Sequence, residues 1–297
     1  MRVYNYYIIM DKNITKKKEL NIKDENIKAK NPHKIPFINI IQYFIIYSIL
    51  GLVLEMFFGF LVEGVIESRK NFLYGPFSCI YGVGGTFMTL ILHDYKYNKI
   101  KLFFGGMLIG LVIEYAVSFF GEIIFNVKWW DYSAIPFNVN GRVCLLFGII
   151  WGMLAVFLIT TVNPWIDKIL KKLSPKFLKI ITIILVMFMI VNYFITSFAL
   201  KIFNARLVLD YGVELQKTNI VIQEYEQWSN NKIFKTITDI MFSNEIMLKA
   251  FPNLLITLND GTVVRVSSLL PEIQPYYFKL FDRPVDLKNF VIEALKK

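Results

Sequence analysis

The sequence predicts an all-α polytopic membrane protein with about five transmembrane helices and a small α+β region at the C-terminal end. Composition is the first observation: 55% of the 297 residues are hydrophobic, 16% are aromatic and the mean hydropathy is +0.48, which is too apolar for an ordinary soluble protein. The second observation is a set of windows that are apolar on all sides and long enough to cross ~30 Å of hydrocarbon. Because backbone groups cannot stay unpaired in lipid, and barrel-type alternation is absent, these windows are expected to be helices.

The windows form a predicted bundle over residues 35–200. They cover 37–62, 74–92, 102–125, 143–162 and 180–200. The fourth is expected to end at Asn163-Pro164, because proline interrupts helical hydrogen bonding.

The segment before the bundle, residues 1–34, is predicted to be a basic, flexible cytoplasmic tail. It carries nine Lys or Arg against four acids and shows no signal-peptide pattern. Its charge could contact anionic lipid or nucleic acid, but a solvated orientation signal is the favoured interpretation, and no nucleic-acid partner is expected.

The distribution of basic residues predicts the orientation in the cell membrane. Loops 92–101 and 163–179 hold three and five Lys, whereas loops 63–73 and 126–142 hold two basic residues each. The positive-inside rule therefore places the N-terminus in the cytoplasm. Five crossings then place residues 201–297 outside the cytoplasm.

The C-terminal region, 201–297, balances twelve Lys or Arg against eleven acids and is predicted to be a small folded region. Two β-rich runs surround Asp260-Gly261, which predicts a hairpin near 254–268. A packing or partner-contact role is the default for this region, which shows no catalytic motif.

Three carboxylates inside the predicted helices are the most informative residues: Glu55, Glu114 and Glu122. A charge at the bilayer centre costs about 2.5–3.5 kcal/mol on insertion scales, so such residues usually face the bundle interior and find partners. Glu114 and Glu122 are eight residues apart, which separates them by ~12 Å along the helix. They can line one cavity, but they cannot form a tight dyad.

The two loops on the predicted outer side add a polar entrance to these glutamates. Arg69, Asp131 and Arg142 supply its charges. The stretch KWWDYSAIPFNVNGR, residues 128–142, is expected to fold over the bundle and present Asp131, its amides and Arg142 to the glutamates. The accompanying loop and helix-entry residues are Gly75, Pro76, Tyr81, Gly82, Trp129, Trp130, Tyr132, Ser133, Asn138, Asn140 and Gly141.

Each of these features also has a structural interpretation. Trp129 and Trp130 could be interface aromatics, and Asp131 could cap a short helix. Asn140-Gly141 could be a turn, and either arginine could neutralise a carboxylate. Cys79 and Cys144 are read as small buried thiols, so no metal site and no cofactor are predicted.

The same segments resemble the bacterial membrane proteins described as putative ABC-transporter type IV. The resemblance rests on Gly51 and Glu55, NFLYGPFSCIYGVGG after Arg69, EYAVSFFGEIIF, WWDYSAIPFNVNGR and FGIIWG, and it covers about 37–162. It implies a permease-like transmembrane component. Because GVGGTF lacks the Gly-Lys-Ser/Thr of a Walker A loop, ATP hydrolysis would require a separate ATPase subunit. The basic segment WIDKILKKL could bind that subunit or lie on the membrane surface.

Three functions follow as hypotheses. The first is a permease-like protein without catalytic activity of its own, with the glutamates lining a polar pathway. The second is an intramembrane enzyme acting on a lipid or envelope precursor. The third is a membrane scaffold or regulator that binds a partner through its outer loops and C-terminal region. Self-association is also expected, with Gly82–Gly85 and Gly105-Gly106 as candidate contacts.

Overall fold

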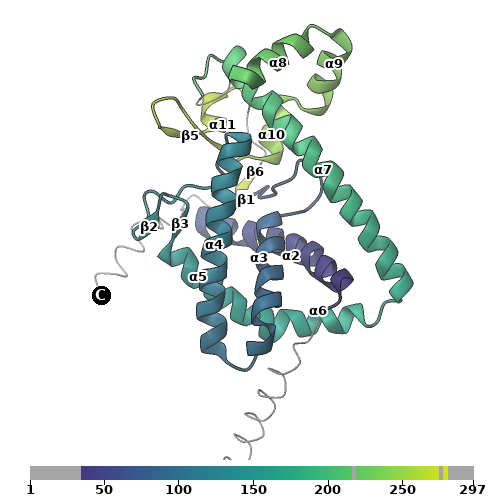
Figure 1. Ribbon diagram of the computed structural model, residues 1–297. Helices are drawn as coiled ribbons and strands as arrows, with labels where there is room; N and C mark the ends of the chain where they lie inside the picture. The colour runs from purple at the N-terminus through teal and green to yellow at the C-terminus, as the bar shows by residue number, and fades with distance from the viewer. Residues whose placement is uncertain (1–34, 216–218, 274–276, 280–297) are drawn as a thin grey trace, which may run out of the picture.

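The computed structural model describes residues 35–215, 219–273 and 277–279, and the predicted basic tail, 1–34, lies outside them (Figure 1). The bundle contains α2 (Phe37–Glu63), α3 (Cys79–Leu92), α4 (Lys99–Phe125), α5 (Leu145–Phe157), α6 (Asn163–Leu170) and α7 (Pro175–Leu209). The 3-10 turn His93–Tyr95 joins α3 to α4, and the π-helical turn Leu158–Val162 joins α5 to α6. The membrane-protein fold class predicted from composition is confirmed.

Four helical segments in the described part of the chain are long and apolar enough to cross a membrane. They are Phe37–Glu63, Lys99–Phe125, Leu145–Leu170 and Pro175–Leu209, of 27, 27, 26 and 35 residues. The predicted count of five is therefore approximate. The second predicted window contains α3, whose 14 residues rise about 21 Å, less than the ~30 Å of a hydrocarbon core.

The start of α3 corrects the prediction of a helix entry at Gly75-Pro76. Gly75 has a φ of +77°, and the helix begins only at Cys79. The backbone N–H of Ser78 instead donates to the carbonyl of Ser48 on α2, at 2.9 Å. A loop therefore occupies the first part of the predicted window, because its backbone N–H groups bond outside a helix: Ser78 donates to Ser48 on α2, and Tyr74 donates to Asn192 on α7.

Pro164 does not end the fourth helix, contrary to the sequence prediction. It lies in the first turn of α6, where an N–H is not needed within the helix. The preceding residues, Leu158–Val162, form a π turn, in which each hydrogen bond spans five residues instead of four. The helical path therefore continues past the proline to Leu170.

Glycines let the helices of the bundle approach closely. A Cβ atom at Gly51 would lie 2.1 Å from the Cβ of Tyr81, and one at Gly82 would lie 2.1 Å from the hydroxyl of Ser48. A Cβ at Gly106 would likewise meet Ala155 at 2.1 Å. The glycine faces proposed for self-association are therefore occupied by helices of the same chain.

The C-terminal region folds as a cap, defined here as the described residues after α7. It contains α8 (Asn219–Ser229), α9 (Lys232–Met241), α10 (Asn244–Ala250), β4 (Leu255–Thr257), β5 (Val263–Arg265), α11 (Val266–Leu269) and β6 (Tyr277–Lys279). Strands β4 and β5 pair antiparallel on either side of Gly261, whose φ is +84°.

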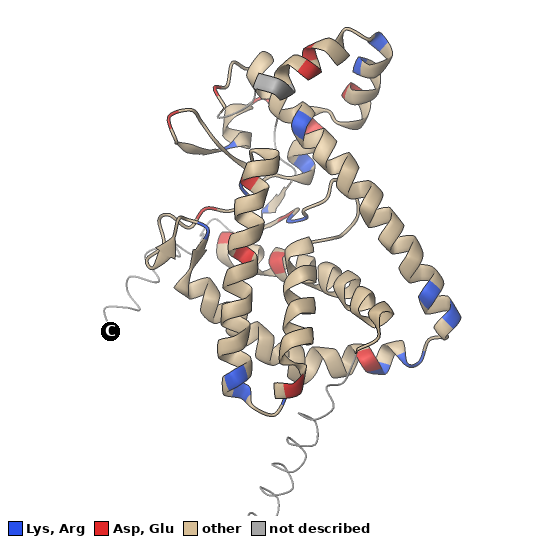
Figure 2. Cartoon of the chain, viewed as in Figure 1, with Lys and Arg blue, Asp and Glu red and all other residues tan. Residues whose placement is uncertain are grey.

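The cap packs on one end of the bundle, where the loops 64–78 and 126–144 also lie (Figure 1). Strand β1 (Val65–Glu67), directly after α2, pairs with β6, and Lys128 forms a backbone bridge with Leu255. The last turns of α7 enter the core of the cap, with Phe203 and Leu207 fully buried. Basic residues at the starts of α4 and α7 lie at the opposite end (Figure 2).

Candidate functional site

The first polar cluster surrounds Glu55 on α2, close to the capped end of the bundle. The hydroxyl of Tyr81, on α3, donates a hydrogen bond to this carboxylate. Arg69, in the loop after β1, interacts electrostatically with the same carboxylate. Glu55 thus receives a phenol donor from one helix and a cation from a loop.

Arg69 is held in place mainly by two other carboxylates. Its Nη2 atom lies 2.8 Å from an oxygen of Glu63 and 2.8 Å from an oxygen of Glu67. Burial by itself would lower the pKa of Arg69, but these carboxylates outweigh burial and raise the pKa. The guanidinium therefore stays charged, and its buried Nε atom has no hydrogen-bond partner among the described residues.

Glu114 on α4 is the most deeply buried of the three predicted glutamates, with 4% of its surface exposed. The hydroxyl of Tyr132 donates to it at 2.9 Å, and the indole N–H of Trp151 donates to its other oxygen at 3.3 Å. Burial, and next the charge of Glu114, raise the pKa of Tyr132 well above its usual value. The phenol therefore remains a hydrogen-bond donor at neutral pH.

Glu55 and Glu114 belong to one cluster, although 59 positions separate them in the sequence. Their charges interact, and the two aromatic donors that bind them are in contact, with the rings of Tyr81 and Trp151 5.3 Å apart. Small residues allow this convergence: Gly51 faces Tyr81, and Gly110 faces Trp151. The bundle therefore brings two carboxylates together behind a pair of aromatic rings.

Glu122, one turn from the end of α4, belongs to a second cluster. It forms an ion pair with Arg142 and lies 3.6 Å from the ammonium of Lys128. Thr257, in strand β4 of the cap, donates a hydroxyl hydrogen bond to it at 3.0 Å, and Arg142 also donates to Ser118 at 3.1 Å. This cluster joins the loop 126–144, α4 and the cap.

The structure corrects the expected role of Asp131. Its carboxylate accepts hydrogen bonds from the backbone N–H and the hydroxyl of Ser133, at 2.9 and 2.5 Å, and therefore stabilises the loop. It does not contact the glutamates within the described structure, because this local turn holds it. Arg142 does reach a glutamate, but that glutamate is Glu122.

The asparagines of this loop bond within the loop or to α4. The amide of Asn138 donates to the carbonyl of Ile135 at 2.8 Å, and that of Asn140 donates to the hydroxyl of Tyr115 at 3.0 Å. Gly141 has a φ of +67° beside Asp131. These residues shape the loop rather than facing Glu55 or Glu114.

The two tryptophans of the loop are packed inside the capped end. The indole N–H of Trp130 donates to the carbonyl of Arg142 at 2.8 Å. Trp129 contacts Phe251 of the cap edge-to-face, with ring centroids 5.6 Å apart. Both tryptophans therefore fix the loop against its neighbours.

A polar cavity of about 50 Å³ lies between the loops and the cap. Its walls include Glu55, Arg69, Lys70, Trp130 and Asn253. The Nε atom of Arg69 and the Oδ1 atom of Asn253 are buried without hydrogen-bond partners in the described structure. Two residues at this cavity thus have hydrogen-bonding atoms without a partner in the described structure, one a donor and one an acceptor.

Sequence reasoning missed three of the residues that bind the glutamates: Trp151, Lys128 and Thr257. Trp151 could have been found from FGIIWG, because an indole inside a helix needs an acceptor for its N–H. Nothing in the sequence places Thr257 beside Glu122, since that contact depends on how the cap docks. No group of three His, Cys, Asp or Glu suited to a metal occurs among the described residues.

Comparison with known proteins places this arrangement in a family. The family model described as putative ABC-transporter type IV matches residues 42–197, more than half of the chain. The chain belongs to this family. The match extends beyond the expected limit of 162 into α7, and it contains Glu55, Arg69, Glu114, Glu122 and Arg142.

The cap of this ABC-transporter-type membrane protein lies outside the matched region, and so do Asn253 and Thr257. No curated protein and no solved structure matches the chain.

Proposed function

We propose that this chain is the permease-like membrane component of an ABC-type transporter, with Glu55 and Glu114 in its substrate pathway. One observation carries the proposal: two carboxylates from different helices converge inside an apolar bundle, each bound by an aromatic donor. Carboxylates in transmembrane helices are expensive to insert and are typically found on substrate or ion pathways. Membership of the family supports the same function.

Glu122 has a different role in this proposal. Its ion pair with Arg142 joins α4 to the loop 126–144, and its hydrogen bond from Thr257 joins α4 to the cap. Together these contacts hold the cap on the bundle. The cap and the two loops would then form the entrance, with Arg69 between the entrance and Glu55. The positive-inside rule supports placing this end outside the cytoplasm.

ATP hydrolysis would come from a separate subunit at the other end. The chain has no Walker A loop, and the α6–α7 corner presents Lys171 and Lys172 as exposed cations. The hydroxyl of Tyr43 on α2 donates to Asp167 on α6, which fixes this corner against the bundle. A rigid basic corner far from the cap is a suitable contact for a cytoplasmic ATPase.

Co-purification tests this proposal. The full chain would be crosslinked mildly in its native membrane and purified, and bound proteins would be identified and quantified. A stoichiometric ATPase is expected, and Lys171→Glu with Lys172→Glu should reduce its recovery. The matched control is Lys232→Glu with Lys235→Glu, two exposed lysines on α9 of the cap. Recovery of only the chain itself would overturn the proposal.

A further inference from the structure

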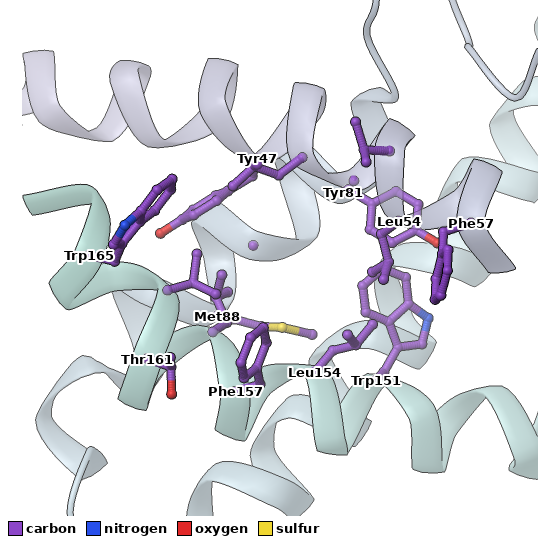
Figure 3. Close-up of a pocket in the computed structure, with 16 residues that line it drawn as sticks. Tyr47, Leu54, Phe57, Tyr81, Met88, Trp151, Leu154, Phe157, Thr161 and Trp165 are labelled. Atoms are coloured by element: carbon purple, nitrogen blue, oxygen red, sulfur yellow. The ribbon is translucent and has the colours of Figure 1, made fainter. Parts of the chain in front are cut away.

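The exposed apolar surface of the bundle shows where lipid lies along its helices. An apolar groove of about 570 Å³ between α2 and the α5–α6 segment has the exposed side chains Val53 and Phe57 in its wall (Figure 3). On α7, exposed apolar side chains recur from Ile180 to Phe194. On spanning helices, apolar side chains that protein does not cover face acyl chains. The acyl-chain region therefore extends along α7 at least as far as Phe194.

The boundary of that region on α7 lies shortly after Phe194. Phe194 is 65% exposed, and Lys201, about two helical turns further on, is an exposed cation. Tyr193, which is also exposed, lies at the same level. Tyrosines are enriched at membrane–water interfaces, where the ring is in the apolar phase and the hydroxyl is hydrated. The interface on this side of the bundle therefore lies at the turns of α7 between Phe194 and Lys201.

Helix α9 of the cap packs against these turns of α7 (Figure 1). The ring of Phe234 on α9 contacts Phe198 on α7 edge-to-face, with centroids 6.2 Å apart. The hydroxyl of Tyr74 donates to the carbonyl of Met241, the last residue of α9, at 3.4 Å. The backbone of Tyr74 in turn exchanges hydrogen bonds with the side chain of Asn192 on α7. These contacts place α9 at the depth of the interface.

The two exposed flanks of α9 differ in chemistry. One flank is apolar and consists of Ile233, Ile237 and Ile240, which are 72%, 49% and 69% exposed. Their spacing of four and three residues puts them on one side of the helix. The other flank is polar, and its exposed residues are Lys232, Lys235, Thr236 and Asp239. An apolar side opposite a charged side is the pattern of a helix that lies in the plane of a membrane interface.

The apolar flank of α9 continues into surface that already faces the interface. At its end, Met241 is exposed beside the exposed ring of Tyr74. Trp228 on α8, another exposed aromatic, lies with its ring 6.0 Å from that of Phe198. Exposed Tyr and Trp beside an apolar helix flank are typical of a surface covered by lipid. The bilayer is therefore the partner that fits this flank.

We infer that α9 is an interfacial helix whose apolar flank, Ile233, Ile237 and Ile240, inserts into the membrane leaflet on the capped side. The polar flank faces water, with Lys232 and Lys235 near the lipid head groups. Lipid thus holds the cap in place in addition to its contacts with the bundle. This interaction goes beyond the proposed transport function and does not depend on which substrate the bundle carries.

Photocrosslinking of the full chain in lipid nanodiscs tests the inference. p-Benzoyl-phenylalanine would replace one residue at a time: Ile237 on the apolar flank, Thr236 on the polar flank, and Phe194 on α7 as the lipid-facing reference. On illumination the ketone of the probe takes a hydrogen from a neighbouring C–H group, and the two carbon radicals combine. A lipid adduct therefore has the mass of the protein plus one lipid, which intact-protein mass spectrometry measures.

The adduct yields at the three positions decide the matter. Ile237 should give about as much lipid adduct as Phe194 and about tenfold more than Thr236, because only the apolar flank contacts acyl chains. A yield at Ile237 no higher than at Thr236 would overturn the inference. Crosslinks from Ile237 to a second copy of the chain would also overturn it, and so would an absence of adducts at Phe194, from which the depth of α9 follows.

Two substitutions test the same contact without a bulky probe. Ile237→Asp and Thr236→Asp place the same charge at neighbouring positions of α9, one on each flank. In nanodiscs, Ile237→Asp should speed amide hydrogen exchange in α9 severalfold, because a carboxylate among acyl chains is costly. Thr236→Asp should leave the exchange close to that of wild type. Equal exchange in the two variants would contradict insertion of the apolar flank.

Discussion

Tyr132 donates a hydrogen bond of 2.9 Å to Glu114, so a residue of the loop 126–144 binds a carboxylate in the interior of α4. The ring of Tyr132 also stacks on Phe147 of α5, with centroids 4.5 Å apart. The loop is therefore anchored inside the bundle, and its conformation depends on the same carboxylate that we place in the substrate pathway.

Removing this hydroxyl should destabilise the protein. Tyr132→Phe leaves the buried Glu114 with one donor fewer, which should lower the free energy of unfolding by about 1–3 kcal/mol. Thermal unfolding followed by tryptophan fluorescence would measure the change. Tyr115→Phe is the matched control, because the Tyr115 hydroxyl bonds only to the exposed Asn140 among the described contacts. Equal melting temperatures for the two variants would show that the bond to Glu114 contributes no more to stability than the exposed bond of Tyr115.

The contribution of Tyr132 should disappear in alkali. Burial and the neighbouring Glu114 raise the pKa of Tyr132, whereas a tyrosine in the unfolded chain titrates near about pH 10. Above that pH the unfolded chain releases a proton that the folded chain retains, so stability falls. The stability difference between wild type and Tyr132→Phe should thus shrink as the pH rises above about 10. A difference that grew with pH would contradict this assignment.

The ion pair of Arg142 and Glu122 should couple the loop to the cap. Either Arg142→Gln or Glu122→Gln alone should cost about 1.5–3 kcal/mol, the range for hydrogen bonds to charged groups. The double variant should cost less than the sum, because the two residues share one interaction. Chemical unfolding of the four proteins measures the coupling, and strict additivity would argue that the pair is not formed.

Two glycines of the bundle should differ sharply in their tolerance of alanine. Gly51→Ala would place a Cβ 2.1 Å from Tyr81 and should destabilise the bundle by about 1–3 kcal/mol, typical of overpacking. It should also displace Tyr81 from Glu55. Gly84→Ala is the control, since its Cβ would lie at an ordinary 3.5 Å from Trp151. Comparable unfolding temperatures for both variants would contradict the close packing of α2 on α3.

Hydropathy predicted the membrane-protein class because it depends on the local run of apolar residues. The predicted limits 37–62 lie close to Phe37–Glu63, whereas Leu145–Leu170 and Pro175–Leu209 extend well past the predicted 143–162 and 180–200. The hydropathy prediction of helix limits was wrong where other segments of the chain supply hydrogen bonds. Ser48 accepts from Ser78 and delays the start of α3, and a π turn lets the chain pass Pro164.

The candidate site was only partly predictable for a related reason. The cost of burying a carboxylate identified Glu55 and Glu114 from sequence alone, but not their partners Tyr81 and Trp151 as a contacting pair. Asp131 was expected to face the glutamates, yet a neighbouring serine binds it first. Long-range contacts such as Thr257 with Glu122 depend on the docked cap, which has no signature in the local sequence.

The docked cap also changes how the scaffold hypothesis should be tested. A deletion after Leu200 would remove Phe203 and Leu207, which are fully buried in the core shared by α7 and the cap. Loss of function after that cut would follow from unfolding as readily as from a lost partner. Single substitutions on exposed faces of the cap, such as Ile233→Asp on α9, would separate the two.

Complementation with Glu114→Gln tests the central claim most directly. Cells lacking the chain would be supplied with wild type or with the variant, and their membrane and metabolite contents would be compared by untargeted mass spectrometry at matched protein levels. Glutamine keeps the size of the side chain and an acceptor for Tyr132 but loses the acceptor for Trp151, so the thermal unfolding of the variant is measured alongside to establish that the bundle persists. We predict that the variant leaves the same accumulated compounds as the deletion. A variant indistinguishable from wild type would contradict a substrate pathway through Glu114.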